Sequence, residues 1–114
     1  FKRGLPREAD MVLDVRFLQN PHYEPLLRPL TGREWEVGQF IERDAAFAPF
    51  IEQTKALFAL LLPRYRDEGK SYLTVAIGCT GGRHRSVYVA ERLSGFFQEL
   101  SYKCSLKHRD LESA

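Results

Sequence analysis

Apolar residues along this chain occur both as short continuous runs and at helical spacing. Runs at residues 11–18 and 72–77 predict two strands, and the second is apolar throughout, as in a strand covered on both faces. Between them, apolar positions recur every third or fourth residue, first over 37–41 and then over 47–62, which predicts two helices. Pro63 is expected to kink or end the second helix because proline has no backbone N–H.

Two further elements are expected after the second strand. One side of a predicted helix carries Val89, Ala90, Leu93, Phe96, Phe97 and Leu100. The last segment has period two, which predicts an edge strand with one wet face: Tyr102, Cys104, Leu106 and His108 face one way, and Lys103, Ser105 and Lys107 face the other. Residues 19–38 have no clear period and predict a long structured loop, of a kind that usually has a function.

This order of elements predicts an α/β fold: a mostly parallel sheet of few strands, flanked by helices and linked by two right-handed crossovers. The 114 residues suit a single domain, and 44% hydrophobic with 28% charged residues is typical of a soluble globular protein. A net charge of +2 says little about nucleic acid. No apolar run is long enough to cross a membrane, and we expect no membrane partner.

The stretch from Gly78 to Ser86 is the most informative part of the sequence. It joins a buried strand to a helix through a glycine-rich turn, so that unpaired backbone N–H groups and a positive helix end face one place. Two arginines and a histidine in the same turn strengthen the preference for an anion. We therefore predict a phosphate site formed by Cys79, Thr80, Gly81, Gly82, Arg83, His84, Arg85 and Ser86.

The same turn leaves an enzymatic alternative open. Cys79, five intervening residues, Arg85 and then Ser86 match the arrangement of cysteine-dependent phosphatases, in which a thiolate attacks phosphorus and the arginine binds two phosphate oxygens. Gly78 stands where those enzymes commonly have a histidine, and Asp14 is the one acid we nominate as a proton donor. A turn that uses its glycines for geometry alone is a third possibility.

Ligands of parallel sheets bind beyond the carboxyl ends of the strands. Polar residues far apart in the sequence are therefore expected to converge there with the turn: Asp14, Arg16, His22 and Arg28. Asp14 and Arg16 share a strand face, which fits either an ion pair that holds the fold or a contact with the ligand.

The remaining residue types add few constraints. Cys79 and Cys104 are expected to be free thiols in a reducing, cytoplasmic compartment, and the histidines and cysteines show no metal-ligand spacing. The basic residues are spread out, but Lys103 and Lys107 share a strand face and allow a basic surface that meets RNA phosphates. The first residue is not methionine and the chain opens abruptly, so we expect a fragment of a longer protein.

Three motifs resemble the C-terminal domain of the RapZ/YvcJ family of bacterial RNase adapter proteins, and the resemblance runs from about Phe1 to Leu111. The motifs are Asp14-Val15-Arg16-Phe17-Leu18-Gln19-Asn20-Pro21-His22, Leu27-Arg28-Pro29-Leu30-Thr31-Gly32, and Tyr72-Leu73-Thr74-Val75-Ala76-Ile77-Gly78-Cys79-Thr80-Gly81-Gly82-Arg83-His84-Arg85-Ser86-Val87-Tyr88.

The resemblance implies a non-catalytic adapter domain of residues 1–114, with no cofactor of its own. Family members carry an N-terminal P-loop domain that binds ATP or GTP, and this sequence has no such loop. The resemblance further implies binding of glucosamine-6-phosphate or another phosphorylated sugar, of a small regulatory RNA and of an RNase E-type endonuclease, and assembly into homo-oligomers.

The resemblance also suggests a role for each group of residues. The turn would hold the phosphate, and the sugar side would be lined by Asp14, Arg16, Asn20, His22, Arg28 and Thr31. Lys103, Lys107 and Arg109 are the candidate RNA contacts. The enterobacterial member ends in a lysine- and arginine-rich tail, whereas Asp110 and Glu112 make the end of this chain partly acidic. A pure oligomerisation module, in which the turn binds nothing, remains an alternative.

Overall fold

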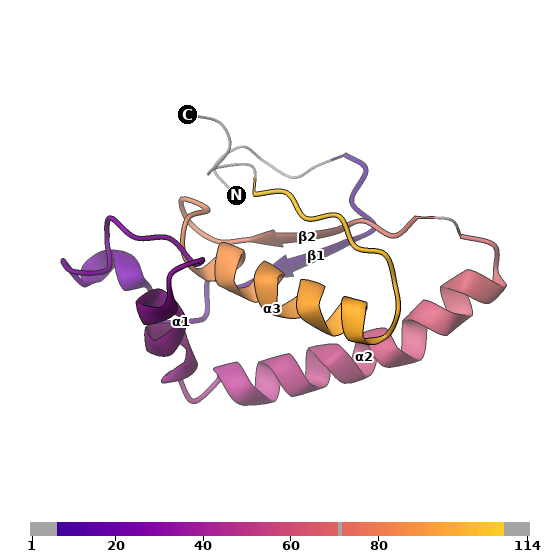
Figure 1. Ribbon diagram of the computed structural model, residues 1–114, viewed down its shortest axis with the longest axis horizontal. Helices are drawn as coiled ribbons and strands as arrows, with labels where there is room; N and C mark the ends of the chain where they lie inside the picture. Colours follow the sequence, from indigo (N-terminus) through magenta and orange to yellow (C-terminus); the bar gives the residue numbers. More distant parts are fainter. Residues whose placement is uncertain (1–6, 71, 109–114) are drawn as a thin grey trace.

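The computed structural model describes residues 7–70 and 72–108, and its sheet consists of two parallel strands (Figure 1). Strand β1 (Met11–Asp14) pairs with β2 (Val75–Gly78), with Met11 opposite Val75 and Asp14 opposite Gly78. Because the strands are parallel, the loops that follow them leave the sheet at the same end, the carboxyl end of both strands. The two predicted halves of the site therefore start side by side.

Helices connect and cover this sheet. Between the strands lie the short 3-10 helix η1 (Pro21–Tyr23), α1 (Trp35–Glu42) and the long α2 (Phe47–Asp67), and β2 is followed by α3 (Arg85–Glu99). Figure 1 shows α3 lying between the sheet and α2. Phe58 of α2 packs edge-on against Phe97 of α3, with ring centroids 5.1 Å apart. The predicted class, a small α/β fold, is confirmed.

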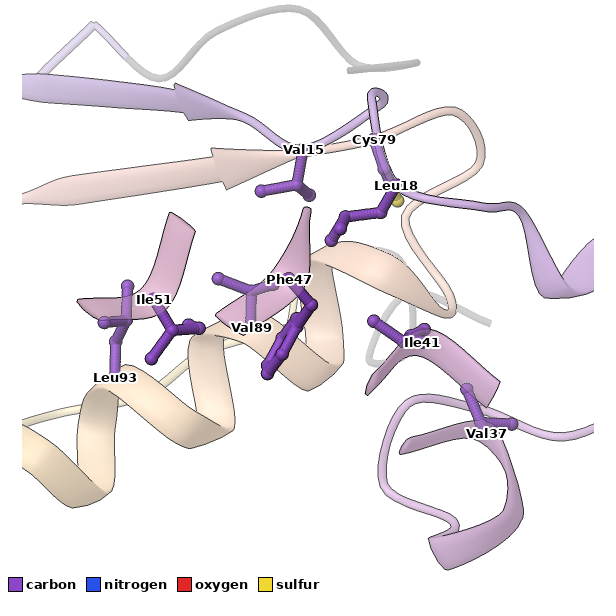
Figure 2. Packing of buried hydrophobic residues seen from close by; sticks show 9 residues of the cluster. All are labelled: Val15, Leu18, Val37, Ile41, Phe47, Ile51, Cys79, Val89 and Leu93. Atoms are coloured by element: carbon purple, nitrogen blue, oxygen red, sulfur yellow. The ribbon is translucent and has the colours of Figure 1, made fainter. Parts of the chain in front are cut away.

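The core lies beneath the carboxyl end of the sheet. Each element or its exit contributes one or two buried side chains, which meet as Figure 2 shows: Val15, Leu18, Val37, Ile41, Phe47, Ile51, Cys79, Val89 and Leu93. Cys79 thus belongs both to the predicted anion turn and to the core. The position of the turn is fixed by the same packing that holds the domain together.

Pro63 is predicted to kink or end the second helix, but it does not end it. Helix α2 continues for one more turn to Asp67, with Pro63 inside it. The side chain of Pro63 is exposed, so its ring meets no packed neighbour, and the break costs mainly one backbone hydrogen bond. Pro49, by contrast, lies in the first turn of α2 as expected.

Both strands are shorter than the apolar runs predicted. The last ladder bond runs from the N–H of Val15 to the carbonyl of Gly78 (2.9 Å), after which the N–H of Leu18 turns back to the carbonyl of Val15 (3.2 Å). Residues 75–77 are half-buried, so the expectation of a strand covered on both faces is also wrong. One edge of β2 has no strand beside it within the described residues.

The predicted last strand does not form. Residues 102–108 have no strand conformation, and a single crossover replaces the predicted two. The segment starts after Ser101, whose φ of 67° turns the chain sharply away from α3. Its ends are held by helices: the guanidinium of Arg66 stacks on the ring of Tyr102 (4.6 Å), and His108 contacts Glu91 of α3 (2.9 Å). These anchors keep it off the sheet edge.

Within the described residues, no single helix has the length and apolar composition to cross a membrane. Helices α1 and α2 pass that test only as a pair bent by 95°.

Candidate functional site

The turn between β2 and α3 presents free backbone donors. Gly81 and Gly82 have φ angles of 81° and 70°, values that favour glycine, and the space beside Gly81 is open. Helix α3 begins at Arg85, directly after the turn. Among the described residues, no hydrogen bond uses the backbone N–H groups of residues 80–85. The amides needed for an anion site are therefore available at the positive end of a helix.

Arg85 lies beneath the turn and is only 4% exposed. Its Nη1 donates to the carbonyls of Arg16 (2.7 Å) and Leu18 (2.9 Å), which fastens the loop after β1 to α3. Its buried Nε has no hydrogen-bond partner in the described part of the chain. The predicted contact of Arg85 with two phosphate oxygens is not made by its Nη1, which already binds the protein, and stays a prediction for its other nitrogens.

His84 is buried against the long loop, with 6% of its surface exposed. Burial lowers the pKa of its imidazole, and the nearby backbone carbonyls of Leu27, Arg28 and Leu30 only partly oppose this effect. Its Nε2 is buried and has no hydrogen-bond partner among the described residues. The imidazole is therefore favoured in its neutral form, next to the turn.

Cys79 is almost fully enclosed, at 1% exposure. Its Sγ accepts a hydrogen bond from the backbone N–H of Ser86 (3.4 Å) and lies 3.3 Å from the Ser86 hydroxyl. These contacts place the sulfur at the start of α3, as a phosphatase would, but almost none of its surface is exposed to solvent. The sulfur acts here as a packing and hydrogen-bonding group inside the turn.

Gly32 brings the long loop against the turn. Its N–H donates to the carbonyl of Arg83 (2.8 Å), and a Cβ at this position would lie 2.3 Å from the carbonyl oxygen of His84 and 2.5 Å from the N–H nitrogen of Tyr88. Only a residue without a side chain allows this approach. The long loop therefore lies against the turn at Gly32, while the convergence of Asp14, Arg16, His22 and Arg28 on one ligand stays a prediction.

Asp14 and Arg16 form an ion pair at the end of β1. The Nη2 of Arg16 lies 2.5 Å from Oδ2 of Asp14, and its Nε donates to both carboxylate oxygens (2.9 and 3.0 Å). Both side chains are about half exposed. The hydrogen bonds from Arg16 lower the pKa of Asp14 to about 2, so this carboxylate is charged at neutral pH. Of the two interpretations left open, the ion pair is present, and contact with a ligand is untested.

The other predicted sugar-side residues hold the loop in shape. The side chain of Asn20 caps η1 by accepting from the N–H of His22 (3.0 Å), and Nε of Arg28 donates to the carbonyl of His22 (2.7 Å). The hydroxyl of Thr31 accepts from the N–H of Arg33 (3.2 Å). The imidazole of His22 and the guanidinium of Arg28 stay exposed, which leaves both open to solvent.

The remaining predicted residues divide between the turn and the C-terminal segment. Thr80 and Arg83 are exposed on the turn, whereas Lys103 and Lys107 are exposed on the segment 102–108, away from it. Arg109 lies outside the described residues. Within the described part of the chain, no three His, Cys, Asp or Glu side chains gather as metal ligands, and no disulfide joins Cys79 to Cys104.

Sequence reasoning missed a cavity of about 860 Å³ between β2, α3 and the segment 102–108. A last strand paired with β2 would fill this space. The period-two pattern predicted such a strand, so no cavity was expected. It also missed the cluster on the outer side of α3, in which Glu42 accepts hydrogen bonds from Tyr88 and Arg92. No motif marks that cluster, because its members lie on different helices.

Comparisons with known proteins give a consistent result. The family model described as the RapZ C-terminal domain matches residues 1–112. A nucleotide-binding protein of Rhodospirillum rubrum is 59% identical over 112 residues, which cover 98% of this chain and 35% of that protein. An RNase adapter protein RapZ of Pectobacterium carotovorum is 51% identical over 112 residues, covering 98% and 39%. The chain thus spans little more than a third of the length of these curated relatives.

Proposed function

Because this chain belongs to the RapZ C-terminal domain family, we propose that it is a non-catalytic domain that senses a phosphorylated sugar and binds RNA within an RNase adapter. The relative from Pectobacterium carotovorum is named as such an adapter. In the longer protein, a P-loop domain that binds ATP or GTP would precede this one. A small regulatory RNA, an RNase E-type endonuclease and further copies of the chain would be its partners in the cytoplasm.

The free backbone amides of residues 80–85 are the observation that carries the phosphate part of this proposal. A phosphate seated on them would meet the positive end of α3 and the exposed guanidinium of Arg83. Within the described residues, the buried Nε of Arg85 has no hydrogen-bond partner and lies beside the same turn. Buried polar atoms are rarely left without a partner, so a bound oxyanion would accept the hydrogen bond that this N–H does not make within the described residues.

The sugar would extend from the turn toward the end of β1. Arg85 binds the carbonyls of Arg16 and Leu18, and Asp14 lies opposite Gly78 at the start of the turn. A sugar phosphate held on the turn would therefore have the Asp14 carboxylate beside it. Its lowered pKa keeps it negative, which suits the ammonium group of glucosamine-6-phosphate. The exposed His22 and Arg28 would meet hydroxyl groups, since each offers a polar side chain to solvent at the same loop.

Isothermal titration of the chain with glucosamine-6-phosphate tests this proposal. We expect Arg83→Gln to weaken binding roughly tenfold, because one charge-assisted phosphate contact is lost. Arg64→Gln, a change of another exposed arginine on the far helix α2, is the matched control and should bind like the wild type. Equal affinity of the wild type and Arg83→Gln would remove Arg83 from the site, and absence of binding to the wild type would refute the phosphosugar proposal.

Glucose-6-phosphate, which lacks the amine, tests the sugar side. The wild type should prefer the amino sugar, and Asp14→Asn should reduce that preference without abolishing the binding of glucose-6-phosphate.

Phosphate-ester hydrolysis by Cys79 is the second candidate, favoured by the contact between its Sγ and the backbone of Ser86. The enclosure of the sulfur argues against it. An aryl phosphate assay separates the two candidates: turnover that is lost in Cys79→Ser would establish the enzyme, and turnover equal to a buffer blank would exclude it.

A further inference from the structure

The cavity of about 860 Å³ is a slot along the free edge of β2. Every residue from 72 to 79 lines it, and so does every residue from 102 to 108 on the opposite side. A pocket on the face of a sheet touches only alternate residues of a strand, because successive side chains point to opposite faces. Contact with consecutive residues means that the slot runs along the backbone, between two extended segments.

The direction of the β2 backbone groups supports this geometry. Thr74 and Gly78 direct their carbonyl oxygens toward β1, where both accept backbone hydrogen bonds (2.8 and 2.9 Å). In a parallel strand the N–H and C=O of one residue point to the same side, and neighbouring residues point to opposite sides. Val75 and Ile77 therefore direct their N–H and C=O groups away from β1, into the slot.

The segment 102–108 does not satisfy these groups. Among the described residues, no backbone hydrogen bond joins it to β2, although the burial of residues 102–105 alternates as in a strand. Its anchors at Tyr102 and His108 hold it on the other side of the cavity. Two extended backbones thus face each other across a space that a third strand would fill.

The charged residues around the slot favour an added strand that carries acidic side chains. Among the described residues, the cations that line it are Arg66, Lys70, Lys103 and Lys107, and Glu8 contributes the one carboxylate. Lys70 also pairs with Asp10 (3.0 Å), which leaves the two lysines of the segment 102–108 as exposed cations beside the opening. An extended peptide with acidic side chains on one face complements this rim, and its apolar face meets the lining of α3.

We propose that the slot binds an extended acidic peptide segment of a partner protein, which adds a strand to the free edge of β2. The main-chain groups of Val75 and Ile77 would supply the hydrogen bonds, and the lysine pair at 103 and 107 would select acidic side chains. The slot reaches the proposed phosphate turn, because Cys79, Gly82 and Ser86 line it, whereas no predicted sugar-side residue does.

A fluorescein-labelled octapeptide of alternating valine and glutamate is the probe, measured by fluorescence anisotropy with the whole chain. We expect saturable binding that weakens at least tenfold in the Lys103→Glu, Lys107→Glu double variant. The matched control is the Arg43→Glu, Arg64→Glu double variant, which places the same charges at exposed positions away from the slot and should bind normally. A peptide N-methylated at every residue should lose binding, since it has no backbone N–H group to donate to a strand edge.

Hydrogen exchange followed by NMR gives an independent readout at the edge itself. The amides of Val75 and Ile77 should exchange readily in the free chain and become protected when the valine–glutamate peptide is added. Protection already present in the free chain would mean that the chain closes its own slot, and would overturn the proposal. So would full binding of the N-methylated peptide, or binding of an oligouridylate to the two lysines when the peptide does not bind. Titration of the wild type with glucosamine-6-phosphate alone tests the phosphosugar proposal, so the failure of one proposal is distinguishable from the failure of the other.

Discussion

Gly32 is the residue whose size most directly determines the shape of the site. A methyl group at this position would meet backbone atoms of His84 and Tyr88 at 2.3 and 2.5 Å, and backbone cannot move aside as a flexible side chain does. We therefore expect Gly32→Ala to lower the free energy of unfolding by about 2–3 kcal/mol. Urea denaturation followed by circular dichroism measures this loss.

Gly95 provides the control for Gly32→Ala. It lies on the exposed side of α3, and a Cβ there meets nothing within 4 Å. Gly95→Ala should raise the stability by about 0.5–1 kcal/mol, the difference in helix propensity between the two residues. If Gly32→Ala were equally harmless, the close approach of loop and turn would not exist in solution.

His84 makes the stability depend on pH. Its folded-state pKa lies below the ordinary value of 6.5, so below that pH the unfolded chain takes up a proton that the folded chain does not. The free energy of unfolding should fall as the pH drops from about 7.5 to 5.5, by at most about 1.4 kcal/mol per pH unit from this group. His84→Gln, which does not titrate, should show a smaller fall in paired urea titrations. Parallel curves for the two proteins would contradict this account.

Among the elements, α2 contains a defect that its packing tolerates. Pro63 leaves one carbonyl of the preceding turn without its helical partner, yet the helix continues to Asp67. Because the ring is exposed and fills no core position, we expect Pro63→Ala to stabilise the domain by about 1–3 kcal/mol. Thermal unfolding measures this gain. A lower Tm would show that the proline bend is needed for packing.

Comparing the predicted elements with those that form shows what the sequence pattern can and cannot predict. Helix α3 and the start of α2 follow from apolar spacing, because the buried residues Val89, Leu93 and Ile51 are local features of the pattern. The segment 102–108 has an equally good strand pattern but forms no strand. Its anchors, Arg66 and Glu91, lie on other elements, and contacts of this kind have no signature in local periodicity.

At the scale of the whole molecule, parallel strand pairing is what makes the site predictable. Both strands end on the same side of the sheet, so Asp14 lies beside Gly78 at the start of the turn, as the sequence indicates. The direction of the Arg85 side chain could not be predicted, since it depends on the carbonyls of Arg16 and Leu18, which are exposed by a turn that no motif marks. Sequence located the glycine-rich turn, whereas tertiary contacts decided which arginine faces solvent.

Ligand binding and global stability should be linked through the contact between the turn and the loop after β1. The proposed phosphate seat exists only when the turn is folded onto the loop after β1, so a ligand of the native state stabilises the entire domain. At about 100 times Kd, glucosamine-6-phosphate should add about 2.7 kcal/mol, which raises the Tm of a domain of this size by roughly 10 °C. Differential scanning calorimetry measures the shift. Glucosamine at the same concentration should leave the Tm unchanged, because without a phosphate it has nothing to place on the amides of residues 80–85; an equal shift would move the site away from the turn.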